Sequence, residues 1–488
     1  MARVFTCIIS PALPISAYPE FPGPSTHMPM VQSQTQSHTA YIAMGSNLGP
    51  RAAHLHAALQ AMASFAVVED TSFLYETPPA YVTDQPDFLN AVCRIRTDLA
   101  PAELLAALKS VERRLGRTET VRFGPRVIDL DILFYDDLCL DEEELTLPHP
   151  RLAERDFVLR PLCDLVPDLR HPRLQATVQE LLQALPPPDM HRVTPVGEQL
   201  WRWGEKTYVM GILNATPDSF SGDGLLQDPD PVARAVAQAR HFVDAGAHCL
   251  DVGGQSTRPQ HPVISEEEEL ARVIPVIQAL AGEVPVPISV DTFRASVAKA
   301  ALGAGASLIN DVWGTLLDPA MATVAAQANV PLVVMHNRMP NPDPTYRPVA
   351  AQMEAAYRYQ DVASDVWSDL DAILARARRA GVPRWHLIVD PGIGFGKTVG
   401  QQLALIRRLD ELTARGYPLL FGPSRKSFIG KVLGDVPPEE RLEGTLATCV
   451  LAIDRGADIL RVHDVQAVAR AARMTDAVVR PAAWQAWS

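Results

Sequence analysis

The chain has 488 residues, of which 47% are hydrophobic and 21% are charged, and its formal net charge is −13. This composition is typical of globular proteins and leaves ample length for more than one core. The acidic balance excludes a general nucleic-acid binder, which needs a basic face. A membrane-spanning helix needs roughly 18 consecutive apolar residues, and the sequence has no such run.

The amino-terminal segment differs in composition from the remainder. Residues 1–38 are rich in Pro, Ser, Thr and Gln, and the apolar part of "VFTCIISPALPISA" is short and broken by prolines. A signal sequence has a longer apolar region, and a transit peptide has more Arg. We predict a disordered leader, with a targeting segment as the alternative. The six cysteines are scattered without a CxxC pair, which indicates free thiols in a reducing compartment and predicts a cytoplasmic protein.

The first globular unit, predicted over 39–185, contains "RFGPRVIDLDILFY" at 122–135. Its period-two alternation predicts a strand with Asp129 and Asp131 on one face and apolar residues on the other. Adjacent carboxylates repel each other, and Asp is depleted in strands. A divalent cation makes the pair tolerable, since Mg2+ held by carboxylates and substrate phosphates is a common arrangement around ATP. The alternative is an edge strand with a solvated face. Several basic residues accompany the pair: Arg117, Arg122, Arg126, His149 and Arg155.

A second unit, predicted over 205–480, follows a Pro-rich stretch. Three consecutive prolines in "LPPPDMHRVTPVGEQ" predict a linker over 186–204. Beyond it, short apolar runs alternate with Ala-rich helical segments that end at glycine. The eight expected strands lie at 208–213, 248–254, 286–292, 306–312, 331–336, 387–392, 418–424 and 459–464. Eight strands alternating with helices over about 250 residues predict a (β/α)8 barrel of the α/β class.

Polar residues stand at the carboxyl ends of these runs. They are Asn214, Asp251, Asp291, Asn310, His336, Asp390, Ser424 and His463. Barrels of this type carry the active site at that mouth, so we expect these side chains to converge. The alternative is that strand ends are simply where a chain becomes polar, or that an individual Asp caps a helix.

Two groups within the mouth have different chemistry. One offers cationic donors and an amide, and suits a polyphosphate anion with Mg2+: Asn214, Arg258, Arg461 and His463. The other is rich in acceptors with one added donor, and suits a flat heterocycle with an amidine-like edge: Asp291, Asn310, Asp390 and Lys426. The segment "PGIGFGKT" (391–398) nearly matches a phosphate-binding P-loop. We reject that interpretation because Pro391 lacks an N–H and cannot adopt positive φ.

Seven motifs in order make the second unit resemble dihydropteroate synthase: "GILNATPDSFSGDG", "DVGGQSTRP", "SVDTFR", "INDV", "DPGIGFGK", "SRKSFIG" and "RVHD". The resemblance implies condensation of 6-hydroxymethyl-7,8-dihydropterin diphosphate with 4-aminobenzoate and release of pyrophosphate. It implies that the acceptor-rich group holds the pterin and that the cationic group holds the diphosphate, with Mg2+ near Asn214. It places Thr257, Arg258 and Ser424 near the aminobenzoate and implies a homodimer through the barrel. Gln255 replaces an acid, "SGDG" reorders the first loop, and "MHNR" varies the fifth-strand motif.

The first unit resembles 6-hydroxymethyl-7,8-dihydropterin pyrophosphokinase through "YIAMGSNLG", "YETPPAYVTDQPDFLN", "VERRLGR", "FGPRVIDLDILFY" and "PHPRLAERDFVLRPL". The resemblance implies a ferredoxin-like α+β fold, Mg2+ on Asp129 and Asp131, and contacts between ATP and a further set of side chains: Glu112, Arg117, Arg126, His149 and Arg155. It implies that Phe88 and Phe157 sandwich the pterin ring, consistent with aromatic stacking, and that Asn90 bonds the ring edge. Glu119 stands where the family often has a basic residue.

Together the two units resemble the fused bifunctional folate enzyme, in which the first unit makes the diphosphate that the second expels. One alternative is a pterin-binding barrel that transfers methyl groups to a corrinoid, which "STRP" and "SRKS" disfavour. Another alternative is a pterin-binding protein with an inactive kinase unit. That protein would bind pterin and form no AMP from ATP.

Overall fold

The structure is a computed structural model, and it describes residues 37–80, 82–118, 124–187, 189–216, 230–255, 263–339 and 357–480. The predicted leader therefore lies outside the described residues, except that strand β1 begins at His38. Within the described ranges, no helix is both long enough and apolar enough to cross a bilayer. The five cysteines in these ranges are free thiols.

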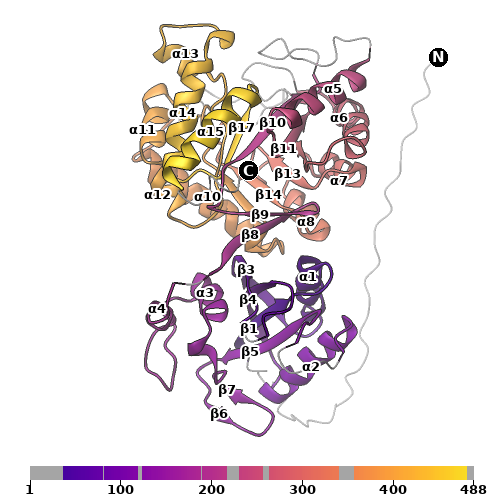
Figure 1. Cartoon of the computed structure of the whole chain (residues 1–488), viewed down its shortest axis with the longest axis vertical. Helices are drawn as coiled ribbons and strands as arrows, with labels where there is room; N and C mark the ends of the chain where they lie inside the picture. Colours follow the sequence, from indigo (N-terminus) through magenta and orange to yellow (C-terminus); the bar gives the residue numbers. More distant parts are fainter. Residues whose placement is uncertain are drawn as a thin grey trace, which may run out of the picture. The chain divides into compact units, whose positions relative to one another are not determined.

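The first fold is a sheet with two pairs of helices (Figure 1). Its strands are β1 (His38–Ser46), β2 (Val67–Thr71), β3 (Leu74–Thr77), β4 (Phe88–Thr97) and β5 (Asp129–Tyr135). Its helices are α1 (Arg51–Met62), α2 (Pro101–Arg114), α3 (Asp156–Leu165) and α4 (Val178–Gln183). The small hairpin β6 (Leu140–Asp141) and β7 (Thr146–Leu147) follows β5, and the short 3-10 helix η1 (Leu152–Glu154) precedes α3.

The order of the strands confirms the predicted ferredoxin-like α+β fold. The sheet runs β5-β1-β4-β3, with β2 also pairing to β4, and the β1–β5 and β1–β4 pairs are antiparallel. Leu55 of α1 and Leu108 of α2 bury their side chains on one face, while Leu159 of α3 and Val178 of α4 do so on the other. β5 is the edge strand of this sheet; its apolar side chains are buried, whereas Asp129 and Asp131 are only half-buried.

The stretch 186–204, predicted as a linker, carries regular structure. It contains β8 (His191–Val196) and β9 (Gln199–Arg202), and β8 pairs with β3, so both strands extend the first sheet. Trp201 and Trp203 are buried against Tyr208 at the start of the barrel. The preceding helix α4 ends at Gln183, before the prolines, and β8 then pairs with a strand more than a hundred residues earlier.

The second fold is the predicted barrel, whose sheet has eight parallel strands; several of them are labelled in Figure 1. The strands are β10 (Tyr208–Asn214), β11 (Cys249–Gly253), β12 (Ile288–Asp291), β13 (Leu308–Asp311), β14 (Leu332–Met335), β15 (Leu387–Asp390), β16 (Leu420–Phe421) and β17 (Ile459–Val462). They pair in the order β15-β14-β13-β12-β11-β10-β17-β16, and a parallel bridge between Val389 and Leu419 closes the ring. All eight predicted strands and the fold class are therefore confirmed.

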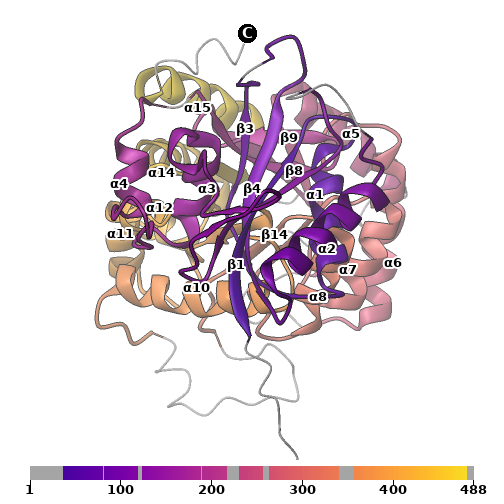
Figure 2. The ribbon, with the colours of Figure 1, turned by 90° about the horizontal axis from the view of Figure 1, so that it is seen from below.

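Helices form a ring around these strands (Figure 2). They are α5 (Pro231–Asp244), α6 (Glu266–Ala281), α7 (Ala295–Ala304), α8 (Ala320–Ala328), α10 (Val362–Arg379), α11 (Val399–Arg407), α12 (Leu409–Thr413), α13 (Ser427–Val432), α14 (Leu442–Asp454) and α15 (Val465–Val479). Two 3-10 helices, η3 (Arg384–His386) and η4 (Pro438–Glu440), complete the described elements of this fold.

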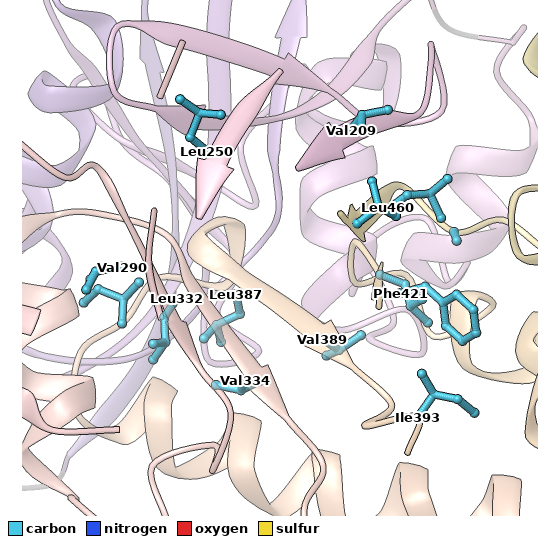
Figure 3. Close-up of a cluster of buried hydrophobic side chains, with 14 of the residues drawn as sticks. Val209, Leu250, Val290, Leu332, Val334, Leu387, Val389, Ile393, Phe421 and Leu460 are labelled. Carbon is cyan, nitrogen blue, oxygen red and sulfur yellow. The ribbon is translucent and has the colours of Figure 1, made fainter. Parts of the chain in front are cut away.

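Alternation along the strands decides which side chains face the inside of the barrel. Tyr208, Met210, Ile388 and Ile459 belong to one buried cluster with Trp201 of β9. The residues between them, among them Val209, Leu250, Val389 and Leu460, form the cluster shown in Figure 3. Because strand residues alternate with period two, the predicted polar residues of β11, β12, β13, β15 and β17 share the parity of the first cluster. The inside is thus apolar at the amino ends of the strands and polar at their carboxyl ends.

Candidate functional site

A cavity of about 290 Å³ opens beside strand β5 of the first fold. Nine of the ten side chains predicted for this unit line it: Phe88, Asn90, Arg117, Arg126, Asp129, Asp131, His149, Arg155 and Phe157. They come from β4, β5, the start of α3 and the segments that flank β5, so tertiary folding brings together residues spread over 70 positions. Arg122 and Glu119 lie outside the described residues.

The two aspartates occupy the same face of β5, as predicted. Ile128 and Leu130 are fully buried in the core on the opposite side. Asp129 accepts a hydrogen bond from Arg117 Nη1 at 2.5 Å through Oδ1 and from Arg126 Nη1 at 2.5 Å through Oδ2. β5 does lie at one edge of its sheet, as the alternative expected, but the face that carries the two acids lines a cavity with basic walls and does not face open solvent.

The pKa values of the two acids are shifted in opposite directions. Burial opposes ionisation of Asp129, but the charges of Arg126 and Arg117 outweigh it and hold its pKa below the usual range. Burial, followed by the negative charge of Asp129, raises the pKa of Asp131. The nearest cation that the structure gives Asp131 is Lys109, whose Nζ lies 3.8 Å from Oδ1. Asp131 is therefore the carboxylate that gains most from an added cation.

Glu112 lies behind the cavity wall. It is 3% exposed, and its Oε1 accepts hydrogen bonds from Arg117 Nη1 at 2.6 Å, Lys109 Nζ at 2.8 Å and the backbone N–H of Leu130 at 2.7 Å. It thus orients two cations that line the cavity, and direct contact with ATP stays a prediction. Sequence reasoning missed Lys109, although its i,i+3 spacing from Glu112 on a helix was a usable signal.

The aromatic side of the cavity carries Phe88 and Phe157, each with an arginine over its ring. Arg126 Cζ lies 5.9 Å from the Phe88 centroid and Arg155 Cζ lies 5.6 Å from that of Phe157. Asn90 Nδ2 donates to Thr77 Oγ1 at 2.8 Å, which fixes the amide orientation. Thr77 and Gln85 also line the cavity, and the sequence analysis did not single them out.

The mouth of the barrel is organised around Arg461. Its Nε donates to Asp251 Oδ2 at 2.6 Å and its Nη2 donates to Asp291 Oδ2 at 2.6 Å. Asn310 Nδ2 donates to the same Asp251 oxygen at 2.9 Å. The structure therefore places Arg461, which the sequence grouped with the diphosphate residues, against Asp291 of the acceptor-rich group. Asp251, noted only as a strand-end residue, is the fully buried centre of this network.

Burial shifts the pKa values of three ionisable side chains at the mouth of the barrel. It raises the pKa of Asp291 to about 7 although Arg461 opposes the change, and it raises the pKa of Asp390 in the same direction. Burial also lowers the pKa of Lys426 to about 8, against the pull of Asp390. Lys426 Nζ donates to the carbonyl oxygen of Ile393, beside Asp390. A protonated carboxyl group can donate as well as accept a hydrogen bond, so the raised pKa of Asp291 suits the amide and amidine edge of a heterocycle.

Some of the remaining predicted site residues of the barrel lie in segments that the structure describes, and others do not. Ser424 Oγ lies 3.0 Å from His463 Nδ1, so these two meet at the mouth. Asn214 ends β10 beside Gly253 of β11. Thr257, Arg258 and the "SGDG" loop lie outside the described residues. Gln255 is buried, and its Oε1 accepts a hydrogen bond from Ile264 N at 2.8 Å.

The rejected P-loop is a turn built around a buried lysine. Lys397 Nζ donates to the carbonyl oxygens of Gly392 and Phe395 at 3.0 and 3.1 Å and lies 2.9 Å from His336 Nδ1. His336 Nε2 in turn lies 3.0 Å from Asp369 Oδ2. The lysine thus supports the loop that follows Asp390. The sequence did not predict this role, because His336 and Asp369, which complete the contacts of Lys397, lie far from it in the chain.

Comparison with known proteins identifies the family. Residues 41–167 match the family described as 7,8-dihydro-6-hydroxymethylpterin-pyrophosphokinase, and residues 210–463 match the family described as pterin binding enzyme. The mitochondrial folate synthesis bifunctional protein of Arabidopsis thaliana is 41% identical over 479 residues, which cover 92% of this chain and 85% of that protein. The chain belongs to the bifunctional folate synthesis family.

A further relative and a solved structure are similar to this chain in sequence and in fold, respectively. The folic acid synthesis protein fol1 of Pneumocystis carinii is 40% identical over 461 residues, and the chain spans 60% of its length. The structure of Plasmodium falciparum HPPK-DHPS with pteroate shares the fold, with a TM-score of 0.75, 20% identity, and coverage of 91% of this chain and 98% of that one. That structure shows the fold alone. The two family matches and the 41% identity to the Arabidopsis bifunctional protein confirm the predicted bifunctional assignment, and they disfavour the corrinoid methyltransferase alternative.

Proposed function

We propose that the first unit transfers the diphosphate of ATP to 6-hydroxymethyl-7,8-dihydropterin and that the second condenses this product with 4-aminobenzoate to give 7,8-dihydropteroate and pyrophosphate. The observation that carries the first step is the convergence of the Asp129–Asp131 pair with Arg117 and Arg126 in one cavity that also contains Phe88. The aromatic side chains would stack against the pterin ring, and the charged side chains would bind the phosphates.

The residues of this cavity fit Mg2+. Asp129 and Asp131 would hold it together with ATP phosphates, and the ion would offset the negative charge of the transferring group. The described residues contain no set of three His, Cys, Asp or Glu side chains that could hold a metal by themselves. That finding fits an ion which keeps waters and substrate oxygens as ligands. Burial and the charge of Asp129 raise the pKa of Asp131, and a bound cation would oppose both effects. Mg2+ near Asn214 stays a prediction.

The basic side chains of the kinase cavity would bind and orient the phosphates. Arg117 and Arg126 each donate to Asp129 through one guanidinium nitrogen, Nη1. The N–H groups on their other guanidinium nitrogens can therefore bind phosphate oxygens. Arg155 lines the same cavity and would extend this cationic surface, and His149 beside it would offer a ring N–H as a donor. Burial lowers the pKa of His149, so its imidazole is largely neutral at pH 7.

In the barrel, the acceptor-rich group would hold the pterin edge. Asp291, Asn310 and Asp390 are buried at the carboxyl ends of three strands, and Lys426 adds a donor beside Asp390. Cationic groups that stabilise the departing diphosphate let the carbon–oxygen bond break, and the aromatic amine then attacks the pterin-bound carbon and loses a proton. His463 and Ser424 stand at this mouth, and Arg258 and Thr257 are predicted to join them.

Association and location are also proposals. Apolar side chains on α14 and α15 are exposed, namely Val450, Leu451, Met474 and Val478. We expect the barrel to form a homodimer through such a surface, which light scattering on a sizing column can test. The thiol pattern favours the cytoplasm, whereas two plant relatives are named as mitochondrial. Fractionation of cells that produce the tagged full chain decides between these compartments.

A two-step assay tests the function. Purified protein with ATP, 6-hydroxymethyl-7,8-dihydropterin and Mg2+ should release AMP, and addition of 4-aminobenzoate should yield dihydropteroate by mass spectrometry. Asp129→Asn with Asp131→Asn should lower AMP release by about 100-fold or more, since both cation ligands are weakened, while dihydropteroate formation from supplied pterin diphosphate persists. AMP release at the wild-type rate in this double variant would refute the role of the pair. Pterin binding without AMP from the wild-type chain would indicate an inactive kinase unit.

A further inference from the structure

Arg202, in the stretch that joins the two folds, reaches a buried carboxylate of the first sheet. Its Nε and Nη2 both donate to Glu76 Oε2, at 2.9 and 2.7 Å. Glu76 belongs to β3 and is 6% exposed. Burial opposes its ionisation, but the hydrogen bonds from Arg51 and Arg202 prevail and hold its pKa below the usual range. A carboxylate this deeply buried depends on its donors to stay charged and fixed.

The second oxygen of Glu76 holds Arg51 at the start of α1. Arg51 Nη2 donates to Glu76 Oε1 at 2.8 Å, and Arg51 Nη1 donates to the carbonyl oxygen of Asp87 at 2.8 Å. Asp87 directly precedes Phe88, the first residue of β4 and part of the cavity wall. A continuous series of charge-assisted hydrogen bonds therefore leads from Arg202 to the backbone beside Phe88.

A second support reaches the same segment from another direction. Asn47 Nδ2 donates to the carbonyl oxygen of Pro86 at 3.0 Å and to Gln85 Oε1 at 3.1 Å. Asn47 Oδ1 accepts a hydrogen bond from Arg126 N at 2.7 Å. The segment 85–88 is thus held at one point by Asn47, next to the phosphate side of the cavity, and at the other by Arg51. The support from Arg51 depends on β9, because Arg202 of β9 holds Glu76, to which Arg51 donates.

We propose that Arg202 is a positioning residue for the pyrophosphokinase site, which through Glu76 and Arg51 fixes the segment 85–88 and the Phe88 ring against which the pterin binds. The inference rests on the proposed function of the first unit. It means that the kinase site requires a side chain from the stretch that connects it to the barrel. Loss of Arg202 should weaken the binding of the pterin and leave the binding of ATP unchanged, because Glu112 and Asn47 hold the residues that face the phosphates.

The test compares steady-state constants of full-length variants. Arg202→Met should raise the KM for 6-hydroxymethyl-7,8-dihydropterin about tenfold, because a misplaced wall weakens binding, while the KM for ATP and kcat change less than about twofold. Arg202→Lys, which keeps the charge with a single donor point, should recover part of the loss. Dihydropteroate formation from supplied pterin diphosphate should be unchanged. Arg96→Met is the matched control, since it removes an exposed ion pair with Glu69 from the same sheet.

A double variant separates positioning from general weakening. Arg51→Met alone should raise the pterin KM as Arg202→Met does, and the two substitutions together should add little, because they interrupt one series of contacts. Additive effects, equal rises in the KM for ATP and pterin, or a pterin KM within about twofold of wild type would each overturn the proposal. If Arg202→Met does not fold, Glu76→Gln must show the same pterin-selective rise. A wild-type chain that forms no AMP would refute the proposed function, whereas an active wild type with unaffected variants refutes the role of Arg202.

Discussion

Arg461 joins two carboxylates that have almost no access to water, and its removal should destabilise the barrel. Asp251 is fully buried and Asp291 is 8% exposed, and each accepts a hydrogen bond from Arg461 at 2.6 Å. Arg461→Met keeps an apolar stem of similar length and leaves both acids without their cation. Breaking a buried pair in this way costs about 3–5 kcal/mol. We expect the lower end, about 3 kcal/mol, because one acid can take up a proton instead.

Tryptophan fluorescence during heating measures this loss of stability. All seven tryptophans follow residue 200, and their emission reports on the second fold together with its junction to the first sheet, since Trp201 lies on β9 and Trp385 packs in the core cluster of the first fold. A loss of about 3 kcal/mol corresponds to a fall of about 6–12 °C in the midpoint for a domain of this size. Adding Asp251→Asn should restore part of the loss, because an amide still accepts the hydrogen bond from Asn310 and carries no buried charge.

The pH dependence gives an independent check. The folded pKa of Asp291 is about 7, above its unfolded value of about 3.9. The folded chain therefore binds more protons, and this group lowers stability progressively as pH rises from about 4 to about 7. Without Arg461 the folded pKa rises further, so the deficit of the variant should be larger at about pH 8 than at about pH 5.5. A midpoint within about 2 °C of wild type at pH 8, or a larger deficit at the lower pH, would refute the reasoning.

Two further substitutions probe the loop after Asp390. Gly392→Ala should lower the fluorescence midpoint by about 5 °C or more, because φ is +65° and an added Cβ would lie 1.9 Å from the carbonyl oxygen of His336; Gly282→Ala, whose Cβ meets open space, should stay close to wild type. Lys397→Met should reduce the rise in midpoint between about pH 7 and pH 9. Burial lowers the folded pKa of Lys397 to about 7, so the unfolded chain binds more protons in that window, whereas the exposed Lys299→Met should keep the wild-type slope.

The sequence by itself determined the features that local patterns record. Alternation around Asp129 and Asp131 placed both acids on one face of a strand, because successive side chains in a strand point to opposite sides. The repeated succession of apolar runs and helical segments gave eight strands, and the polar residues at their ends marked the barrel mouth. The absent glycine at Pro391 excluded a P-loop from chain geometry alone. Each of these inferences depends on residues that are neighbours in the chain.

Only the tertiary structure decided which distant residues meet. The prolines at 186–188 predicted a linker over 186–204, yet β8 within this stretch pairs with β3, and Arg202 bonds Glu76 across 126 positions. Arg461 joins acids of β11 and β12 although β17 is not adjacent to β12 in the barrel. Glu112 lies behind the kinase cavity and not on its surface. Long-range pairing and burial set these contacts, and since both depend on the packing of the whole fold, no local periodicity encodes them.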